Sequence, residues 1–131
     1  MQSEKEYAVV AEREWYLPCA QHPSGLSVSL QTRGTLDDCR DYVDDAVICL
    51  SSGQAGETLS IREIVDTRAD YQAWLDSAVD WPGCPYPDGI DYDANCAWAE
   101  ERAMSGHIGT LPIATDDGGL ILVDMSRNLD A

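Results

Sequence analysis

The chain has 131 residues, of which 44% are hydrophobic; this excludes a disordered polypeptide and suits one domain with its own core. Its 24 acidic residues outnumber its 8 lysines and arginines, so the formal net charge is −16. Such a charge excludes a protein that holds nucleic acid or anionic membranes with basic side chains, because affinity for phosphate comes from lysine and arginine. The charge favours a basic partner, whose approach it accelerates, while solubility and adaptation to high salt are the alternative explanations.

The sequence indicates a cytoplasmic protein. Its first residues lack the basic and then apolar pattern of a signal peptide, and no apolar run approaches the roughly 18 residues of a membrane span. The five cysteines are therefore expected to be free thiols, since disulfides are rare in the cytoplasm. Cys39 and Cys49 lie within apolar patterns, which predicts that both are small residues of the core.

The first quarter of the chain is predicted to form a β-hairpin. Apolar and polar residues alternate in residues 7–17 and again in residues 26–32, which is the period of a half-buried strand. A loop over residues 18–25, marked by two prolines and a glycine, separates the two runs. We expect the two strands to pair in antiparallel fashion across this loop.

The middle of the chain mixes helical and strand signals. Thr35 is a suitable N-cap for a helix over residues 36–45, where apolar side chains recur at helical spacing. A short β-branched run predicts a strand over residues 46–50. Farther on, Ser60 and Glu63 have the spacing of a capping box, which predicts that a second helix begins there.

Two more helices and a second hairpin complete the domain. Residues 69–79 have helical periodicity, and residues 94–104 are expected to form a helix because an apolar run precedes charged residues there and Gly106 ends it. A loop rich in proline and glycine over residues 81–89 lies between them. Residues 111–124 place apolar arms around an Asp-Asp-Gly-Gly turn, which is typical of a hairpin because glycine tolerates positive φ. This order predicts a single α+β domain, in which a small antiparallel sheet of N-terminal and C-terminal hairpins packs with two to four helices.

The sequence contains no recognisable catalytic motif. Neither of its two histidines lies in a pattern that pairs a base with a nucleophile, and no glycine-rich run has the ending of a phosphate-binding loop. We therefore expect no enzymatic activity, no cofactor and no metal. A small metal- or thiol-dependent protein remains an alternative, with Cys19, His22, Cys84 and His107 as its candidate residues.

Acidic residues interleaved with tyrosine are the candidate functional residues. Aromatic side chains anchor protein interfaces, and charge steers the encounter. Two clusters fit this description, one in the helix expected at residues 36–45 and one around residues 86–93. The candidate partner-binding residues are Asp37, Asp38, Asp41, Asp44, Asp45, Tyr86, Asp88, Asp91, Tyr92 and Asp93. For the first cluster, a solvated helix face is the alternative interpretation.

The second hairpin also carries a family resemblance. The run Gly109-Thr-Leu-Pro-Ile-Ala-Thr-Asp-Asp-Gly-Gly-Leu-Ile-Leu-Val-Asp124 resembles the late hairpin of the SUKH superfamily, in which a Pro-Ile run, an acidic glycine-rich turn and a strand ending in Asp recur. The upstream run Leu59-Ser-Ile-Arg-Glu-Ile64 and the tryptophan-bearing helix after it are similar in order. This resemblance implies a non-enzymatic α+β protein of the bacterial immunity type, which binds and neutralises a toxin, often a nuclease.

Two functions are consistent with the acidic composition. The first is an inhibitor or immunity protein that binds a basic protein, such as a nuclease toxin whose basic surface must hold nucleic acid. The second is a nucleic-acid mimic of phage or mobile-element origin that blocks a restriction or CRISPR-type complex. The second function predicts carboxylates spaced along the surface like phosphates.

Overall fold

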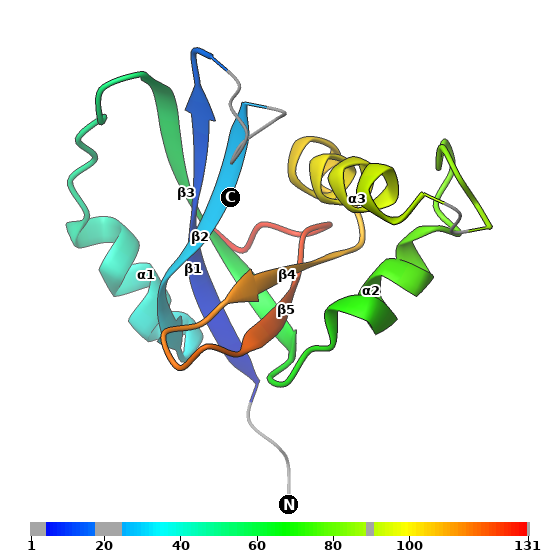
Figure 1. Cartoon of the computed structure of the whole chain (residues 1–131). Helices are drawn as coiled ribbons and strands as arrows, with labels where there is room; N and C mark the ends of the chain where they lie inside the picture. The colour runs from blue at the N-terminus through cyan, green and yellow to red at the C-terminus, as the bar shows by residue number, and fades with distance from the viewer. Residues whose placement is uncertain (1–4, 18–24, 89–90, 131) are drawn as a thin grey trace, which may run out of the picture.

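The computed structural model describes residues 5–17, 25–88 and 91–130. Within these residues, five strands form one curled antiparallel sheet in the order β2-β1-β3-β5-β4, and three helices pack against it (Figure 1). The strands are β1 (Glu6–Trp15), β2 (Leu26–Gly34), β3 (Gln54–Asp66), β4 (Thr110–Ala114) and β5 (Leu120–Asp124), and the helices are α1 (Leu36–Asp45), α2 (Tyr71–Ala78) and α3 (Tyr92–Gly106). The predicted α+β fold with an antiparallel sheet and an N-terminal and a C-terminal hairpin is confirmed.

The sheet separates two hydrophobic cores. Successive side chains of a strand point to opposite faces, so Ala8 and Val10 of β1 belong to one core and Val9 to the other. The larger core lies on the inner face of the sheet, beneath α2 and α3. The smaller core lies on the outer face, where Val9 and Ile61 pack with Cys39 of α1. β1 is consequently buried on both faces, as befits a strand in the interior of the sheet.

The helix predicted to begin at Ser60 is wrong, because residues 54–66 form the long strand β3. The capping-box spacing is a local signal, whereas β3 gains backbone hydrogen bonds from β1 along one edge and from β5 along the other. Its side chains alternate, with Leu59 and Ile61 facing α1 while Ser60 and Arg62 lie on the inner face. Pairing on both edges outweighs the local preference for a helix start.

The strand predicted over residues 46–50 is also absent from the structure, which shows irregular chain there. β5 pairs with β3 only over residues 64–66, at the far end of that strand, and residues 46–50 pair with none of the described strands. Val47, Ile48 and Leu50 are therefore exposed, by 85%, 45% and 52%. Cys39 is fully buried as predicted, but Cys49 is exposed and not a core residue.

The other predicted strands and helices agree with the structure, while the predicted loop over residues 18–25 lies outside the described residues except for Gly25. β1 and β2 pair from Tyr7 opposite Gly34 to Glu14 opposite Leu26, and β4 pairs with β5 around the turn that contains Gly118. The helices expected over residues 36–45, 69–79 and 94–104 correspond to α1, α2 and α3. None of the described helices combines the length and the apolar character needed to cross a membrane.

Candidate functional site

Helix α1 presents a continuous acidic face to solvent. The helix begins at Thr35, whose Oγ1 accepts a hydrogen bond of 3.1 Å from the backbone N–H of Asp38. Its opposite side packs on the smaller core, which fixes the direction of the exposed side chains. We call the exposed side the α1 face; it consists of Asp38, Asp41, Tyr42 and Asp45. These residues have helical spacing and line a surface hollow of about 480 Å³.

The carboxylates of α1 do not stabilise the helix by pairing. All five predicted aspartates of α1 are exposed, and none makes an ion pair with another described residue. Asp44 and Asp45 lie in the last turn, which has no basic residue, and there the helix dipole disfavours negative charge. Asp41 and Asp45 also repel each other across one turn. The last turn of α1 therefore carries unfavourable charge that a bound cation would neutralise, whereas Asp37 and Asp38 in the first turn have the sign that the dipole favours.

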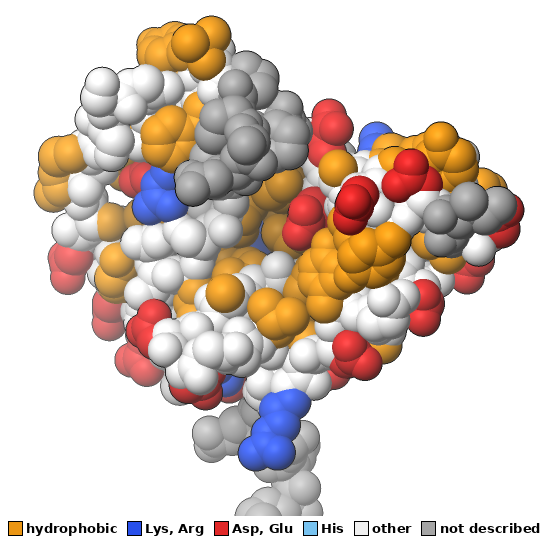
Figure 2. Space-filling model, viewed as in Figure 1, with side chains coloured by type: hydrophobic (Ala, Val, Ile, Leu, Met, Phe, Trp, Pro, Cys, Tyr) orange, Lys and Arg blue, Asp and Glu red, His pale blue; other side chains and the backbone are white. Residues whose placement is uncertain are grey.

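An exposed apolar segment follows the acidic face directly. Tyr42 is partly exposed within the α1 face, and the segment of Val47, Ile48 and Leu50 comes next along the chain. In Figure 2, acidic side chains line the left edge, where α1 lies, and hydrophobic side chains lie above them. Exposed apolar groups beside a charged rim are typical of protein interaction surfaces.

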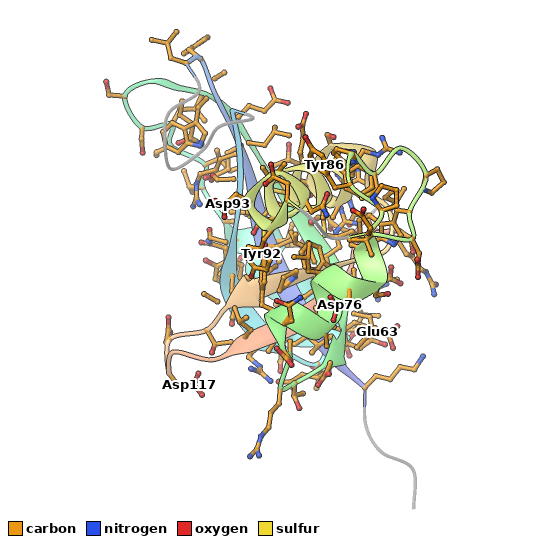
Figure 3. All side chains as sticks on the ribbon, turned by 45° about the vertical axis from the view of Figure 1, so that its right-hand side comes forward. Glu63, Asp76, Tyr86, Tyr92, Asp93 and Asp117 are labelled. Carbon is orange, nitrogen blue, oxygen red and sulfur yellow. The ribbon has the colours of Figure 1, made fainter. Side chains whose placement is uncertain are left out.

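The second predicted cluster lies elsewhere. Figure 1 places the start of α3 on the side of the molecule opposite α1, and Figure 3 shows Tyr86, Tyr92 and Asp93 at this end. Asp88 belongs to the same exposed surface. Asp91 is the N-cap of α3, since its Oδ1 accepts a hydrogen bond of 3.0 Å from the backbone of Ala94. The two predicted clusters thus do not form one surface.

Part of this second cluster has a structural role. The side chain of Asn95 is buried, and its Nδ2 donates a hydrogen bond of 2.8 Å to the carbonyl oxygen of Tyr86. The Cys84 thiol lies 3.4 Å from Asn95 Oδ1, so one amide holds the loop before α3 at two points. A hydrogen bond with Cys96 raises the pKa of the Tyr92 hydroxyl. These contacts order the loop and leave α1 as the freer of the two acidic surfaces.

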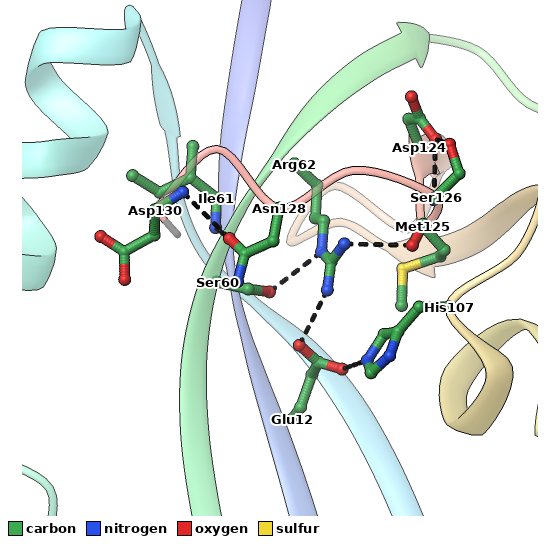
Figure 4. Close-up of polar contacts among 10 residues, drawn as sticks. All are labelled: Glu12, Ser60, Ile61, Arg62, His107, Asp124, Met125, Ser126, Asn128 and Asp130. Atoms are coloured by element: carbon green, nitrogen blue, oxygen red, sulfur yellow. Dashed lines mark hydrogen bonds and ion pairs between the residues drawn. The ribbon is translucent and has the colours of Figure 1, made fainter.

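The inner face of the sheet contains a cleft that the sequence did not predict. It has a volume of about 640 Å³ and lies between β1, β2 and β3, the end of α3 and the segment after β5. Arg62 lies at its floor, with a side chain only 3% exposed (Figure 4). The guanidinium Nη1 donates to the carbonyl oxygen of Met125 at 3.1 Å, and Nε donates to Ser60 Oγ at 3.1 Å.

Glu12 joins this arginine to the end of α3. Its Oε2 accepts a hydrogen bond of 3.2 Å from Arg62 Nη2, and its Oε1 lies 2.7 Å from Nε2 of His107. His107 follows α3 in the left-handed conformation, with φ of 47°, which turns the chain and brings its ring towards the sheet. Burial raises the pKa of Glu12, but hydrogen bonds from His107 and Ser60 and the charge of Arg62 together lower it below its ordinary value.

The sequence carried only an indirect signal for this network. Leu59 to Arg62 alternates apolar and polar residues, which is a strand period, but the capping-box spacing predicted a helix instead. In a helix, Ser60 and Arg62 would not share the face on which they meet Glu12. Once β3 is known, the charged residues of its inner face are recognisable as candidates.

The described residues form no cluster that would support the alternative of a metal-binding protein. Among these residues, no three or more histidine, cysteine or acidic side chains gather where they could hold a metal ion. His107 is engaged with Glu12, and Cys84 with Asn95. Cys19 and His22 lie outside the described residues.

The fold and these surfaces define a small α+β domain with an acidic helix on one face of its sheet and a cleft on the other. Comparison with protein-family models, with curated proteins and with solved structures finds no match for the chain. The resemblance of residues 109–124 to the SUKH superfamily therefore stays a prediction, and the function has to be argued from the surfaces themselves.

Proposed function

We propose that this protein is a non-enzymatic acidic inhibitor of the immunity type, which binds and neutralises a basic protein such as a nuclease toxin. One observation carries the proposal: the α1 face holds exposed carboxylates that pair with no described cation, together with Tyr42. A lysine or arginine of a partner fits the hollow that these side chains line. The net charge of −16 would speed the encounter.

The energetics of α1 favour such a role. Asp44 and Asp45 oppose the helix dipole, and the neighbouring aspartates repel one another. A cationic side chain of a partner would neutralise these carboxylates. The relief of their repulsion would then add to the free energy of binding. The adjacent segment of Val47, Ile48 and Leu50 offers the apolar contacts that contribute most to the affinity of protein interfaces.

The distribution of carboxylates favours an inhibitor over a nucleic-acid mimic. A mimic needs carboxylates at phosphate-like intervals over an extended surface. Here the two predicted acidic clusters lie on opposite sides of the molecule, and the first is concentrated on one short helix beside apolar side chains. A compact acidic and apolar patch matches a basic protein with an apolar pocket.

Affinity capture from the native host tests the proposal. The immobilised wild-type protein is compared with Asp41→Lys/Asp45→Lys and with Asp80→Lys/Asp116→Lys, which makes the same charge change at exposed positions outside α1. We expect the wild type and the control to retain one basic protein and the α1 variant to lose it. Raising the salt from about 0.1 M to 1 M should release the partner, because screening shortens from about 10 Å to 3 Å.

Neutralisation is then measured with the purified partner. Its toxic or nuclease activity should fall on stoichiometric addition of the wild type and of the control, and not on addition of the α1 variant. A partner retained equally by all three proteins and indifferent to salt would refute the proposal. Displacement of a host restriction or CRISPR-type complex from DNA, with no toxin captured, would support the nucleic-acid mimic instead.

A further inference from the structure

The cleft on the inner face contains open space that no side chain of the described residues fills. Gly56 lies inside β3, opposite Glu14 of β1, and a Cβ added to it would meet no atom within 4 Å. Gly56 is not among the glycines with positive φ, so its backbone conformation does not require glycine. A glycine inside a strand often marks a β-bulge or a place where a ligand approaches the backbone, and the pairing of β1 with β3 does shift register directly beside Gly56.

The walls of the cleft are suited to an apolar molecule. Leu26 and Val28 of β2 and Met104 of α3 line it, and Met125 closes the side formed by the segment after β5. Its volume of about 640 Å³ lies in the range of sites for small molecules. Methionine side chains adapt to the shape of what they contact.

The charges of the cleft leave one carboxylate in excess. Glu12 pairs with Arg62, and Arg13 pairs with Glu57 at 2.6 Å, so these four side chains neutralise one another. Glu14 also lines the cleft, is exposed, and makes no ion pair with a described residue. The field of the whole molecule has the same sign. An anion is therefore disfavoured in the cleft and a cation is favoured.

The ion pairs also hold the shape of the cleft. Arg62 joins β3 to Met125, and Glu12 joins β1 to His107 at the end of α3. A buried ion pair is a poor source of stability compared with apolar packing, because its charges lose hydration. Here the ion pair of Glu12 and Arg62 holds the segment after β5 and the end of α3 against the sheet, which gives the cleft the rigid support that a binding site needs.

We propose that this cleft binds a small organic cation with an apolar body. The ammonium group lies beside Glu14, and the body lies over Gly56 against Leu26 and Val28. The site is independent of the α1 face, which lies on the other side of the sheet, so either can fail without the other.

Methyl NMR provides a direct test. The chain has three methionines, and two of them, Met104 and Met125, line the cleft. Protein labelled at the methionine methyl groups is titrated to about 10 mM with 2-phenylethylammonium, 2-phenylethanol or 3-phenylpropanoate, three probes with the same ring and different charge. We expect saturable shifts of both methyl signals with the ammonium, binding about fivefold weaker for the alcohol, and no saturable shift with the carboxylate.

Two variants and one control complete the test. Gly56→Leu should fill the cleft and abolish the shifts, and Glu14→Gln should reduce the affinity for the ammonium to that for the alcohol. Asp80→Asn removes one negative charge from an exposed position outside the cleft and should leave the titration unchanged. Circular dichroism checks that each variant is folded. If Gly56→Leu does not fold, Glu14→Gln still tests the proposal. The proposal is overturned by the absence of saturable shifts with the ammonium, by equal binding of all three probes, or by a Glu14→Gln variant that binds the ammonium as tightly as the wild type does.

Discussion

Replacing Arg62 by methionine should destabilise the protein strongly at neutral pH. The substitution keeps most of the side-chain volume but removes the hydrogen bonds to Ser60, to the Met125 carbonyl and to Glu12. Breaking a buried ion pair from one side costs about 3–5 kcal/mol, because the other charge stays buried without its partner. Glu12 is 18% exposed and keeps its contact with His107, so the lower value, about 3 kcal/mol, applies. This is a large part of the roughly 5–15 kcal/mol that stabilises a typical domain.

The pH dependence of this cost identifies its origin. The pKa of Glu12 is lowered from 4.5, so the wild type has the full stabilisation above that pH and loses it as the pH falls through the folded-state pKa. In the variant, Arg62 no longer lowers the pKa of Glu12 while burial still raises it, so protonation becomes easier than in the wild type even though the hydrogen bond with His107 stays. The difference in unfolding free energy between the two proteins should therefore narrow between pH 7 and about pH 3.5.

Urea unfolding followed by tryptophan fluorescence measures both effects, with Glu12→Gln and Glu12→Gln/Arg62→Met completing a double-mutant cycle. The double variant should be less destabilised than the sum of the single variants by at least about 1 kcal/mol, since it strands no charge. A cost below about 1 kcal/mol at pH 7, or a cost that stays constant down to about pH 3.5, would show that Glu12 does not depend on Arg62.

Two further substitutions test the helix electrostatics and one tight contact. Asp44→Lys should stabilise the protein by about 0.3–1 kcal/mol in low salt, because it replaces an unfavourable charge near the end of α1, and the gain should shrink when urea unfolding is repeated in 1 M salt. Gly109→Ala should cost more than about 2 kcal/mol, because its φ is +62° and the added Cβ would overlap the Trp81 ring. Gly118→Ala is the matched control: φ is +86° with no atom within 4 Å, so its melting temperature should reflect only about 1–2 kcal/mol of backbone strain.

Elements with strong local signals were predictable from the sequence. Thr35 does cap α1, and the Asp-Asp-Gly-Gly turn does form the hairpin of β4 and β5, with Gly118 at positive φ. Helix α2 follows the apolar periodicity of its residues, and α3 ends at Gly106, where the sequence predicts its end. In these cases the hydrogen bonds that define the element join residues close in the sequence, so the local pattern contains the information.

Elements that depend on distant partners were not predictable in this way. Ser60 and Glu63 have the spacing of a helix start, yet both belong to β3, which pairs with strands at the two ends of the chain. The segment with Val47 and Ile48 has a strand composition but pairs with none of the described strands. Strand formation requires a partner, and a partner is a property of the topology.

The sequence by itself determined the net charge, the acidic helix α1 and its exposed aspartates, because helical periodicity decides which side of a helix is apolar and which is charged. Only the tertiary structure decided that the two acidic clusters lie apart and that a cleft exists. Glu12 is 50 positions from Arg62 and 95 from His107, and these side chains meet because β1 pairs with β3 beneath the end of α3. Whether a charged side chain is buried in an ion pair or exposed to solvent depends on the residues that the fold places beside it. The residues next to it in the sequence do not determine those contacts.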